Sequence, residues 1–194
     1  MIQSKSDYLF YVEQDRIANQ IPRERFFDIL FRFIAPNYTY KFLKTLRKVE
    51  YLKNTKGPKS IAFIYYKYKF RRLSLKLGFT IPENVFGPGL SIPHYGTIVV
   101  NGSSRIGAYC RLHAGVNIGA SAGKKAAPCI GNNVYIGPGA IIFGDIKIAN
   151  NVTIGANATV NRDCSTEHVV LAGTPARVVK ENMPNWIEFN RLKI

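Results

Sequence analysis

The chain contains three histidines, and imidazole is the side chain best suited to acid–base chemistry near neutral pH. His94 lies in the short segment Pro93–Gly96, directly ahead of the apolar run Ile98–Val100. An imidazole in such a turn can act as a general base and take a proton from a hydroxyl group near neutral pH. On residue type alone, a histidine held by an ordinary structural hydrogen bond is the simpler interpretation. The choice between a general base and a structural histidine therefore depends on the sequence pattern around His94.

An aliphatic repeat with a period of six indicates the elements that would position this turn. Neither an α-helix, with its period of 3.6, nor a flat strand, with its period of two, explains it. A parallel β-helix does, because each short strand and its corner take six residues and three such units close one coil. The sequence therefore predicts a mainly β fold. The inward-facing members are Ile106, Leu112, Ile118, Ile130, Ile136, Ile142, Ile148, Ile154 and Val160, with a break at Lys124.

A second histidine stands one coil away from the first. His113 follows the inward-facing Leu112, so its side chain is predicted to point outward, and it lies 19 residues after His94. Neighbouring coils are about 4.8 Å apart. His113 is therefore predicted to lie near His94 or to line a cleft beside it, and an ordinary structural role fits the sequence equally well. His168 follows the last repeat and is interpreted as a surface residue.

Charge and composition distinguish the two parts of the chain. Of the 27 Lys and Arg residues, 17 lie in residues 1–77, against 6 of the 12 Asp and Glu. A solvated basic helix face is the simplest interpretation, and contact with an anionic membrane surface is the alternative. No nucleic-acid fold signature accompanies the charge. The N-terminus lacks the apolar core of a signal peptide, so we expect a cytoplasmic protein that could meet the inner face of the membrane. The three cysteines show no disulfide or metal-ligand spacing.

Three units follow from these patterns. Residues 1–79 are predicted to be a helical segment, with helices at about 22–34, 37–54 and 58–77 and a C-terminal stop at Gly78. Residues 80–176 are predicted to form the β-helix. Residues 120–128 (ASAGKKAAP) interrupt it as a loop, and such a loop usually serves a site or an interface. Residues 177–194 form a tail in which a short helix is expected to cap the last coil.

Residues 78–180 resemble the serine O-acetyltransferase branch of the left-handed β-helix, hexapeptide-repeat acetyltransferases. The resemblance rests on GFTIPENVFGPGLSIPHYGTIVVN, GVNIGASAGKK, PCIGNNVYIGPGAIIFGDIKIANNVTIGANATV and AGTPARVVK, in that order. The chain looks most similar to members found among capsule and exopolysaccharide genes. The resemblance implies a left-handed coil, acetyl-CoA as the acyl donor, no metal, and a homotrimer with active sites at the subunit boundaries.

The same resemblance places a catalytic histidine at His94, as general base, with Tyr95 and His113 beside the acceptor. Counting back in sixes from Val100 puts His94 on the inward series, so the Pro93–Gly96 turn is predicted to shift the register and project the imidazole outward. Small residues and two cations would follow acetyl-CoA from the pantetheine to the phosphates. These are Gly119, Ala120, Pro138, Ala156, Arg177 and Lys180. Lys124 and Lys125 in the loop are further candidates for an anionic group.

Three positions depart from the serine enzymes. An aspartate of their first coil aligns with Phe79, the aspartate before their catalytic histidine aligns with Pro93, and their second histidine aligns with Ala127. Those groups help to hold the amino acid, so the sequence favours a hydroxyl of a sugar or polysaccharide precursor as acceptor. The alternative is serine O-acetyltransferase of cysteine biosynthesis. A non-catalytic scaffold or a γ-carbonic-anhydrase-like metal protein is a third reading, but that metal site would need three clustered histidines.

Overall fold

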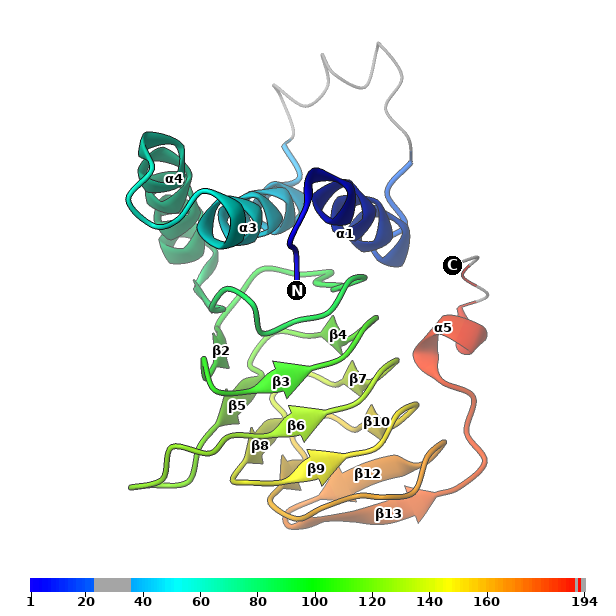
Figure 1. Cartoon of the computed structure of the whole chain (residues 1–194). Coiled ribbons are helices and arrows are strands. Elements are labelled where there is room, and N and C mark those ends of the chain that lie inside the picture. The colour runs from blue at the N-terminus through cyan, green and yellow to red at the C-terminus, as the bar shows by residue number, and fades with distance from the viewer. Residues whose placement is uncertain (23–35, 191, 193–194) are drawn as a thin grey trace.

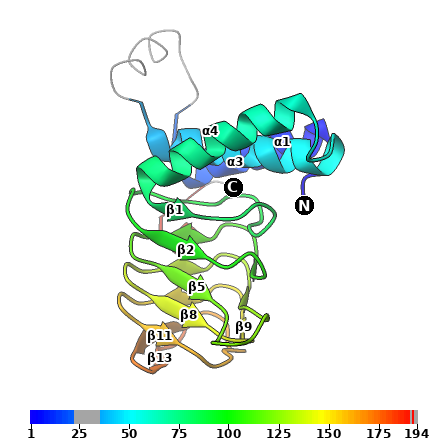
Figure 2. The same ribbon diagram turned by 90° about the vertical axis from the view of Figure 1, so that its left-hand side faces the viewer.

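The computed structural model describes residues 1–22, 36–190 and 192. Short strands from Phe79 onward wind around a continuous apolar core, and three of the described helices lie across one end of the coil (Figure 1). Stacked strands of successive coils form one wall of the coil in Figure 2. The strands are so short because each must turn a corner after two to five residues.

The described strands form three sheets, which we name by one member each. The β2 sheet contains β1 (Phe79–Thr80), β2 (Ile98–Val100), β5 (Asn117–Gly119), β8 (Ile141–Phe143) and β11 (Thr159–Val160). The β3 sheet contains β3 (Arg105–Ile106), β6 (Cys129–Ile130) and β9 (Lys147–Ile148). The β4 sheet contains β4 (Arg111–Leu112), β7 (Tyr135–Ile136), β10 (Thr153–Ile154), β12 (Val170–Gly173) and β13 (Ala176–Lys180).

The strand register explains the six-residue repeat and its break. Ile136 pairs in parallel with Ile154, which is 18 residues later and one full coil away. Across the loop the step is longer, because Ile118 pairs with Ile142, 24 residues later. The loop at 120–128 thus adds six residues to one coil, so the aliphatic series stays in phase on both sides of Lys124. The repeated aliphatic side chains are buried, as predicted.

The helical segment agrees with the sequence in part. The helices α3 (Tyr38–Thr55) and α4 (Ile61–Leu77) match two predicted helices, and Gly78 ends α4 in the left-handed conformation with φ of 76°. The helix α1 (Lys5–Ala18) was not predicted, although Ser4 and Asp7 form a capping box at its start. The helix predicted at 22–34 lies almost entirely outside the described residues. Within the described residues, no helix is long and apolar enough to cross a bilayer.

A buried ionic cluster attaches the helices to the first coil. Arg47 of α3 is fully buried and donates to both carboxylate oxygens of Asp15 in α1, at 2.8 and 3.2 Å, and to Glu50 at 3.0 Å. Its remaining donors reach the carbonyl oxygens of Phe86 and Gly87 in the coil. Burial alone would lower the pKa of Arg47, but the two carboxylates outweigh that effect and raise it. Arg47 is therefore charged, and carboxylate and carbonyl oxygens accept from its donors. Burial raises the pKa of Asp15, and the positive charge of Arg47 opposes that rise.

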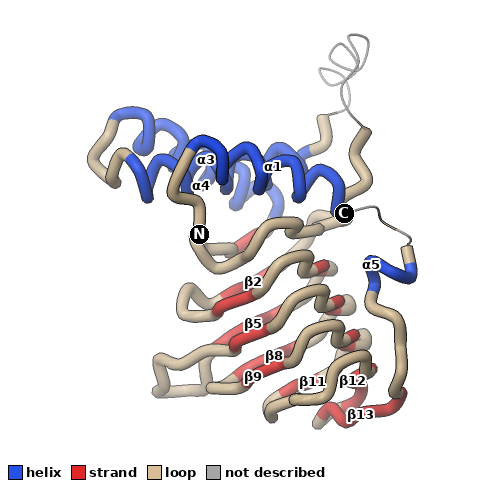
Figure 3. The backbone as a smooth tube through the Cα atoms, turned by 45° about the vertical axis from the view of Figure 1, so that its right-hand side comes forward, coloured by secondary structure: helices blue, strands red, loops and turns tan. Residues whose placement is uncertain are grey.

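The C-terminal segment does not cap the last coil, contrary to the sequence-based expectation. The strand β13 pairs antiparallel with β12 and ends the coil instead. The chain then runs back along the outside of the β4 sheet to α5 (Trp186–Phe189), which lies near α1 (Figures 1 and 3). Trp186 and Ile187 pack against Ala18 of α1, and Trp186 Nε1 donates to the carbonyl oxygen of Tyr109 at 2.8 Å. Buried aromatic surface and this hydrogen bond decide its position.

Candidate active site

His94 projects outward from a turn at the helical end of the coil. Ile92 and Ile98 on either side are fully buried, whereas His94 and Tyr95 are exposed. The turn is fixed to the end of α4, because the N–H of Gly96 donates to the carbonyl oxygen of Leu77 at 3.1 Å. The local break in the alternation therefore has the effect predicted from the sequence: the register shifts and the imidazole faces solvent.

The two histidines are neighbours on successive coils. The ring centres of His94 and His113 are 6.1 Å apart, and His113 is half-buried at the corner that follows β4. The corners stack directly, since the N–H of Gly115 donates to the carbonyl oxygen of Thr97 at 2.7 Å. The ring of Tyr135, one coil further on, is 5.0 Å from that of His113. The spacing of 19 residues thus produces the predicted proximity.

His113 is neutral at physiological pH. Burial, with contributions from the positive charge of Arg111 and from His94, lowers the pKa of His113 to about 4. The Nε of Arg111 lies 3.4 Å from Nε2 of His113, so Nε2 accepts and the proton of the neutral ring is on Nδ1. A neutral neighbour adds no second positive charge when His94 gains a proton. This arrangement suits a base at His94.

Several predicted residues follow the same edge of the coil as the histidines. Pro138 follows β7 and Ala156 follows β10, and both are exposed. The edge is continuous, because the N–H of Gly139 donates to the carbonyl oxygen of Ala114 and the N–H of Asn157 to that of Pro138. A long flexible arm laid along this edge would start beside the histidines and pass Pro138 and Ala156.

The other predicted cofactor residues lie elsewhere. Gly119 is the last residue of β5 and Ala120 follows it, at a different corner of the coil from His113. Arg177 and Lys180 are exposed on β13, at the end of the coil opposite the helices (Figure 1). Lys124 and Lys125 are exposed in the loop. A single chain therefore does not gather all the predicted residues into one groove.

The three departures from the serine enzymes have clear structural counterparts. Phe79 is buried and packs edge-on against Phe42, with ring centres 5.0 Å apart. Pro93 and Ala127 are half-buried and carry no charge. Among the described residues, His94 makes no hydrogen bond to a carboxylate, and no three His, Cys, Asp or Glu side chains are grouped as metal ligands. The groups beside His94 are a second imidazole and, beyond it, a guanidinium.

A pocket adjoining His113 is lined by Arg111, a candidate site residue that the sequence analysis did not identify. Its volume is about 320 Å³, and it lies between the β4 sheet and the C-terminal segment. Arg111 and His113 contribute the cationic and imidazole side chains, and Trp186 of α5 covers them. The sequence did hold a signal, because Arg111 and His113 flank an inward-facing residue and so face the same side of a strand. The covering α5 could not be placed from the sequence.

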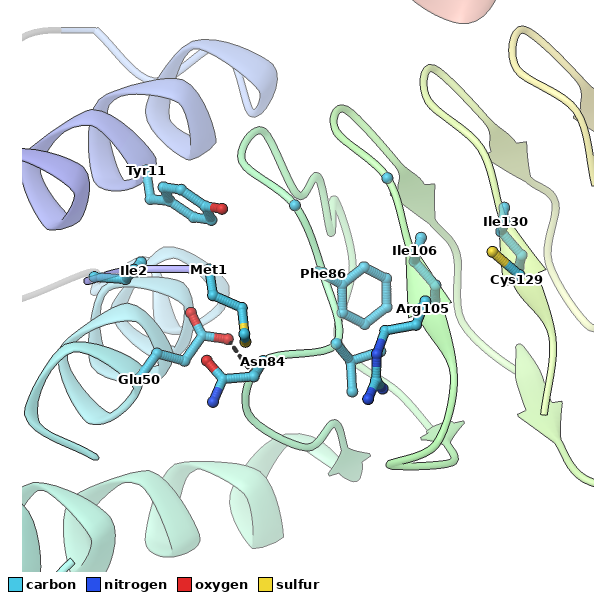
Figure 4. Close-up of a pocket in the computed structure, with 13 residues that line it drawn as sticks. Met1, Ile2, Tyr11, Glu50, Asn84, Phe86, Arg105, Ile106, Cys129 and Ile130 are labelled. Carbon is cyan, nitrogen blue, oxygen red and sulfur yellow. Dashed lines mark hydrogen bonds between the residues drawn. The ribbon is translucent and has the colours of Figure 1, made fainter. Parts of the chain in front are cut away.

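A second pocket lies away from the histidines. Its volume is about 350 Å³, and Figure 4 shows Tyr11 and Glu50 from the helices facing Arg105 and Cys129 of the β3 sheet across it. Glu50 already accepts from Arg47 and from the N–H of Asn84. None of the predicted site residues lines this pocket.

Comparison with known proteins supports the repeat and points to one group of enzymes. Residues 130–162 match the family model described as bacterial transferase hexapeptide (six repeats). A serine acetyltransferase from Synechococcus elongatus is 37% identical over 101 residues, which cover 50% of this chain and 41% of the relative. The chain thus spans less than half the length of this curated relative.

Solved structures agree over a larger share of the chain. The serine acetyltransferase of Neisseria gonorrhoeae superposes with a TM-score of 0.72 at 25% identity, covering 98% of this chain and 73% of that one. A serine acetyltransferase in complex with CoA has a TM-score of 0.70 at 25% identity, covering 91% and 72%. These matches imply a left-handed β-helix with N-terminal helices. They do not show the expected capsule-cluster resemblance or a role in polysaccharide biosynthesis.

Proposed function

We propose that this protein transfers an acetyl group from acetyl-CoA to a hydroxyl group, with His94 as the general base. The observation that carries the proposal is the outward-facing His94 beside a neutral His113, on a coil similar to serine acetyltransferases. His94 would take the proton of the hydroxyl as its oxygen attacks the thioester carbon. The tetrahedral intermediate would then collapse, and the departing CoA sulfur would receive the proton from His94.

Serine is the acceptor that the relatives support, since those compared are serine acetyltransferases. A sugar hydroxyl is the second candidate, and a specific observation favours it: Phe79, Pro93 and Ala127 supply no acidic or imidazole partner for an amino acid. Incubation with labelled acetyl-CoA and either serine or a panel of sugars separates the two. We expect label on an acceptor hydroxyl. Absence of transfer to every acceptor, with intact folded protein, would contradict the proposal.

The edge that carries His113, Pro138 and Ala156 would hold the pantetheine arm, with Gly119 and Ala120 supplied from a neighbouring copy. Those two residues lie at a different corner from His113, so a groove using both sets needs two chains side by side. A head-to-tail contact of this kind closes as a ring. We therefore expect a homotrimer with three sites at subunit boundaries. Light scattering at micromolar concentration tests this, and a monodisperse monomer would contradict it.

Arg177 and Lys180 would contact the phosphates of CoA at the end of the groove. Both are exposed on β13 and so are available to a large anion. Arg177→Glu or Lys180→Glu should raise KM for acetyl-CoA and leave kcat largely intact, because the phosphates are bound equally in the ground and transition states. Steady-state kinetics with acetyl-CoA as the varied substrate measures this. Loss of kcat at unchanged KM would remove both residues from the nucleotide site.

Contact of the N-terminal segment with an anionic membrane stays a prediction. The helix α4 exposes Ile61, Tyr68 and Leu75 and carries five Lys and Arg residues with no Asp or Glu. Apolar groups flanked by cations favour an interfacial helix. Sedimentation with anionic vesicles, against neutral vesicles as the control, tests this contact.

A further inference from the structure

The pocket beside His113 combines one charged group with an aromatic wall. Arg111, His113 and Tyr135 come from the β4 sheet, and the C-terminal helix contributes Trp186, Phe189 and Asn190. Its volume of about 320 Å³ suits a single small metabolite or sugar unit. It adjoins the proposed base, because His113 lines the pocket and its ring centre is 6.1 Å from that of His94.

Arg111 has no anionic partner among the described residues. Its side chain contacts the hydroxyl of Ser91 at 3.3 Å and Nε2 of His113 at 3.4 Å, and its guanidinium carbon lies 5.3 Å from the Trp186 ring centre. These two hydrogen bonds use two of the five N–H donors of a guanidinium and leave three directed elsewhere. Partial burial lowers the pKa of Arg111, which reflects the cost of withdrawing an uncompensated cation from water.

The guanidinium is held in place before any ligand arrives. Trp186 lies over it and is itself fixed by its hydrogen bond to the Tyr109 carbonyl oxygen. Ser91 belongs to the preceding coil and is fully buried, so its hydroxyl is a rigid anchor. A positioned cation with free donors loses little conformational entropy when an anion binds.

We propose that Arg111 binds a carboxylate of the acceptor, in the pocket that Trp186 lines, while the acceptor hydroxyl reaches His94. This inference rests on the proposed acetyl transfer and names the chemical class of its acceptor. A monoanion matches the pocket charge, because His113 is neutral and Arg111 is the single cation lining it in the described structure. The planar fork of a guanidinium also matches the two oxygens of a carboxylate.

The carboxylate could belong to an amino acid or to an acidic sugar. In serine, three bonds separate the carboxylate carbon from the hydroxyl oxygen, a reach on the order of 4 Å. In a hexuronic acid, the 4-hydroxyl has the same three-bond separation, the other ring hydroxyls lie further from the carboxylate, and the ring presents C–H groups that could pack on Trp186. Binding of either acceptor through its carboxylate requires Arg111, so the experiment tests one amino acid and one acidic sugar.

Binding is measured first, without acetyl-CoA, from the imidazole resonances of His113. The probes are serine and glucuronate, and serinamide and glucose are the matched compounds that lack the carboxylate. A bound carboxylate should shift the resonances and raise the titration midpoint of His113, whose charged or titratable neighbours are Arg111, His94 and Tyr135. We expect at least one carboxylate probe to act in this way and its counterpart not to do so.

Kinetics with variants then assigns the effect to Arg111. Arg111→Gln should raise KM for the carboxylate acceptor roughly 10- to 100-fold, the usual cost of losing a hydrogen bond to a charged group. Arg111→Lys keeps the positive charge but not the planar pair of donors, so its KM for the carboxylate acceptor should lie between those of the wild type and Arg111→Gln. Arg105→Gln is the matched control, because Arg105 also directly precedes an inward residue but lies on the β3 sheet. It should behave as wild type. Thermal unfolding verifies that each variant is folded.

The outcomes separate this inference from the proposed function. Acetyl transfer that is equally efficient with the compounds that lack the carboxylate, or unchanged in Arg111→Gln, overturns the carboxylate site and leaves the proposed acetyl transfer intact. Carboxylate binding lost in Arg111→Gln, without acetyl transfer to any acceptor, supports the site and contradicts the proposed function. Preference for serine or for glucuronate supports the site in either case and identifies the source of the carboxylate.

Discussion

Replacing His94 with alanine should lower kcat by 10² or more while acetyl-CoA binding and oligomeric state stay intact. A positioned general base contributes typically 10²- to 10⁴-fold to such a reaction. The coil should survive the change, because His94 is exposed and contributes nothing to the apolar core. Single-turnover kinetics at saturating acetyl-CoA, with binding of CoA measured separately by calorimetry, resolves chemistry from binding.

His113→Ala is the control for this assignment. His113 is neutral and lines the acceptor pocket, so its loss should weaken acceptor binding more than turnover. The reverse pattern, with turnover abolished in His113→Ala and retained in His94→Ala, would show that the general base is His113 and that its assignment to His94 is wrong. Both variants keep the corner backbone, which is held by main-chain hydrogen bonds on either side.

Replacing Arg47 with methionine should reduce the free energy of unfolding by about 3–5 kcal/mol. The change leaves Asp15 and Glu50 buried without the guanidinium that compensates them, and it leaves the carbonyl oxygens of Phe86 and Gly87 without a donor. A loss of this size is a large part of the stability of an ordinary domain. Denaturant unfolding followed by circular dichroism measures it.

Two further variants check the mechanism of this effect. Arg16→Met removes a partly exposed pair with Glu13 in α1 and should cost no more than about 1 kcal/mol. Adding Asp15→Asn to Arg47→Met should recover part of the loss, because it removes one of the buried charges left unpaired. If Arg47→Met unfolds at the same denaturant concentration as the native chain, the cluster is not what holds the helices to the coil.

The coil was predictable from the sequence because its contacts repeat. Each inward aliphatic packs on others a fixed number of residues away, so a period of six reveals all three sheets without knowledge of any single contact. His113 could be placed near His94 for the same reason. The loop also followed, since Lys124 breaks the series where six residues are added to a coil.

The contacts outside the repeat were not predictable in this way. The C-terminal helix meets Tyr109, which is 77 residues earlier, and Asp15 meets the N–H of Leu90, which is 75 residues later. Neither contact belongs to the six-residue repeat, so no periodicity in the sequence indicates it. Arg111 illustrates the consequence: its outward direction follows from the repeat, but the aromatic cover that makes a pocket comes from α5.

The returning C-terminal segment changes how the coil can come apart. A solenoid whose repeats touch only their neighbours can lose its end repeats one at a time. Here the segment after β13 contacts His168 near the last coil, Asn151 in the middle and Tyr109 near the helices, through three separate hydrogen bonds. The segment runs alongside the stacked coils and contacts both ends of the coil. Local unfolding at one end is therefore expected to disturb the hydrogen bonds that the segment makes at the other end. We therefore expect the coil to open more cooperatively than a solenoid without this segment, and the Arg111 pocket, which the segment lines, to be lost when the segment detaches.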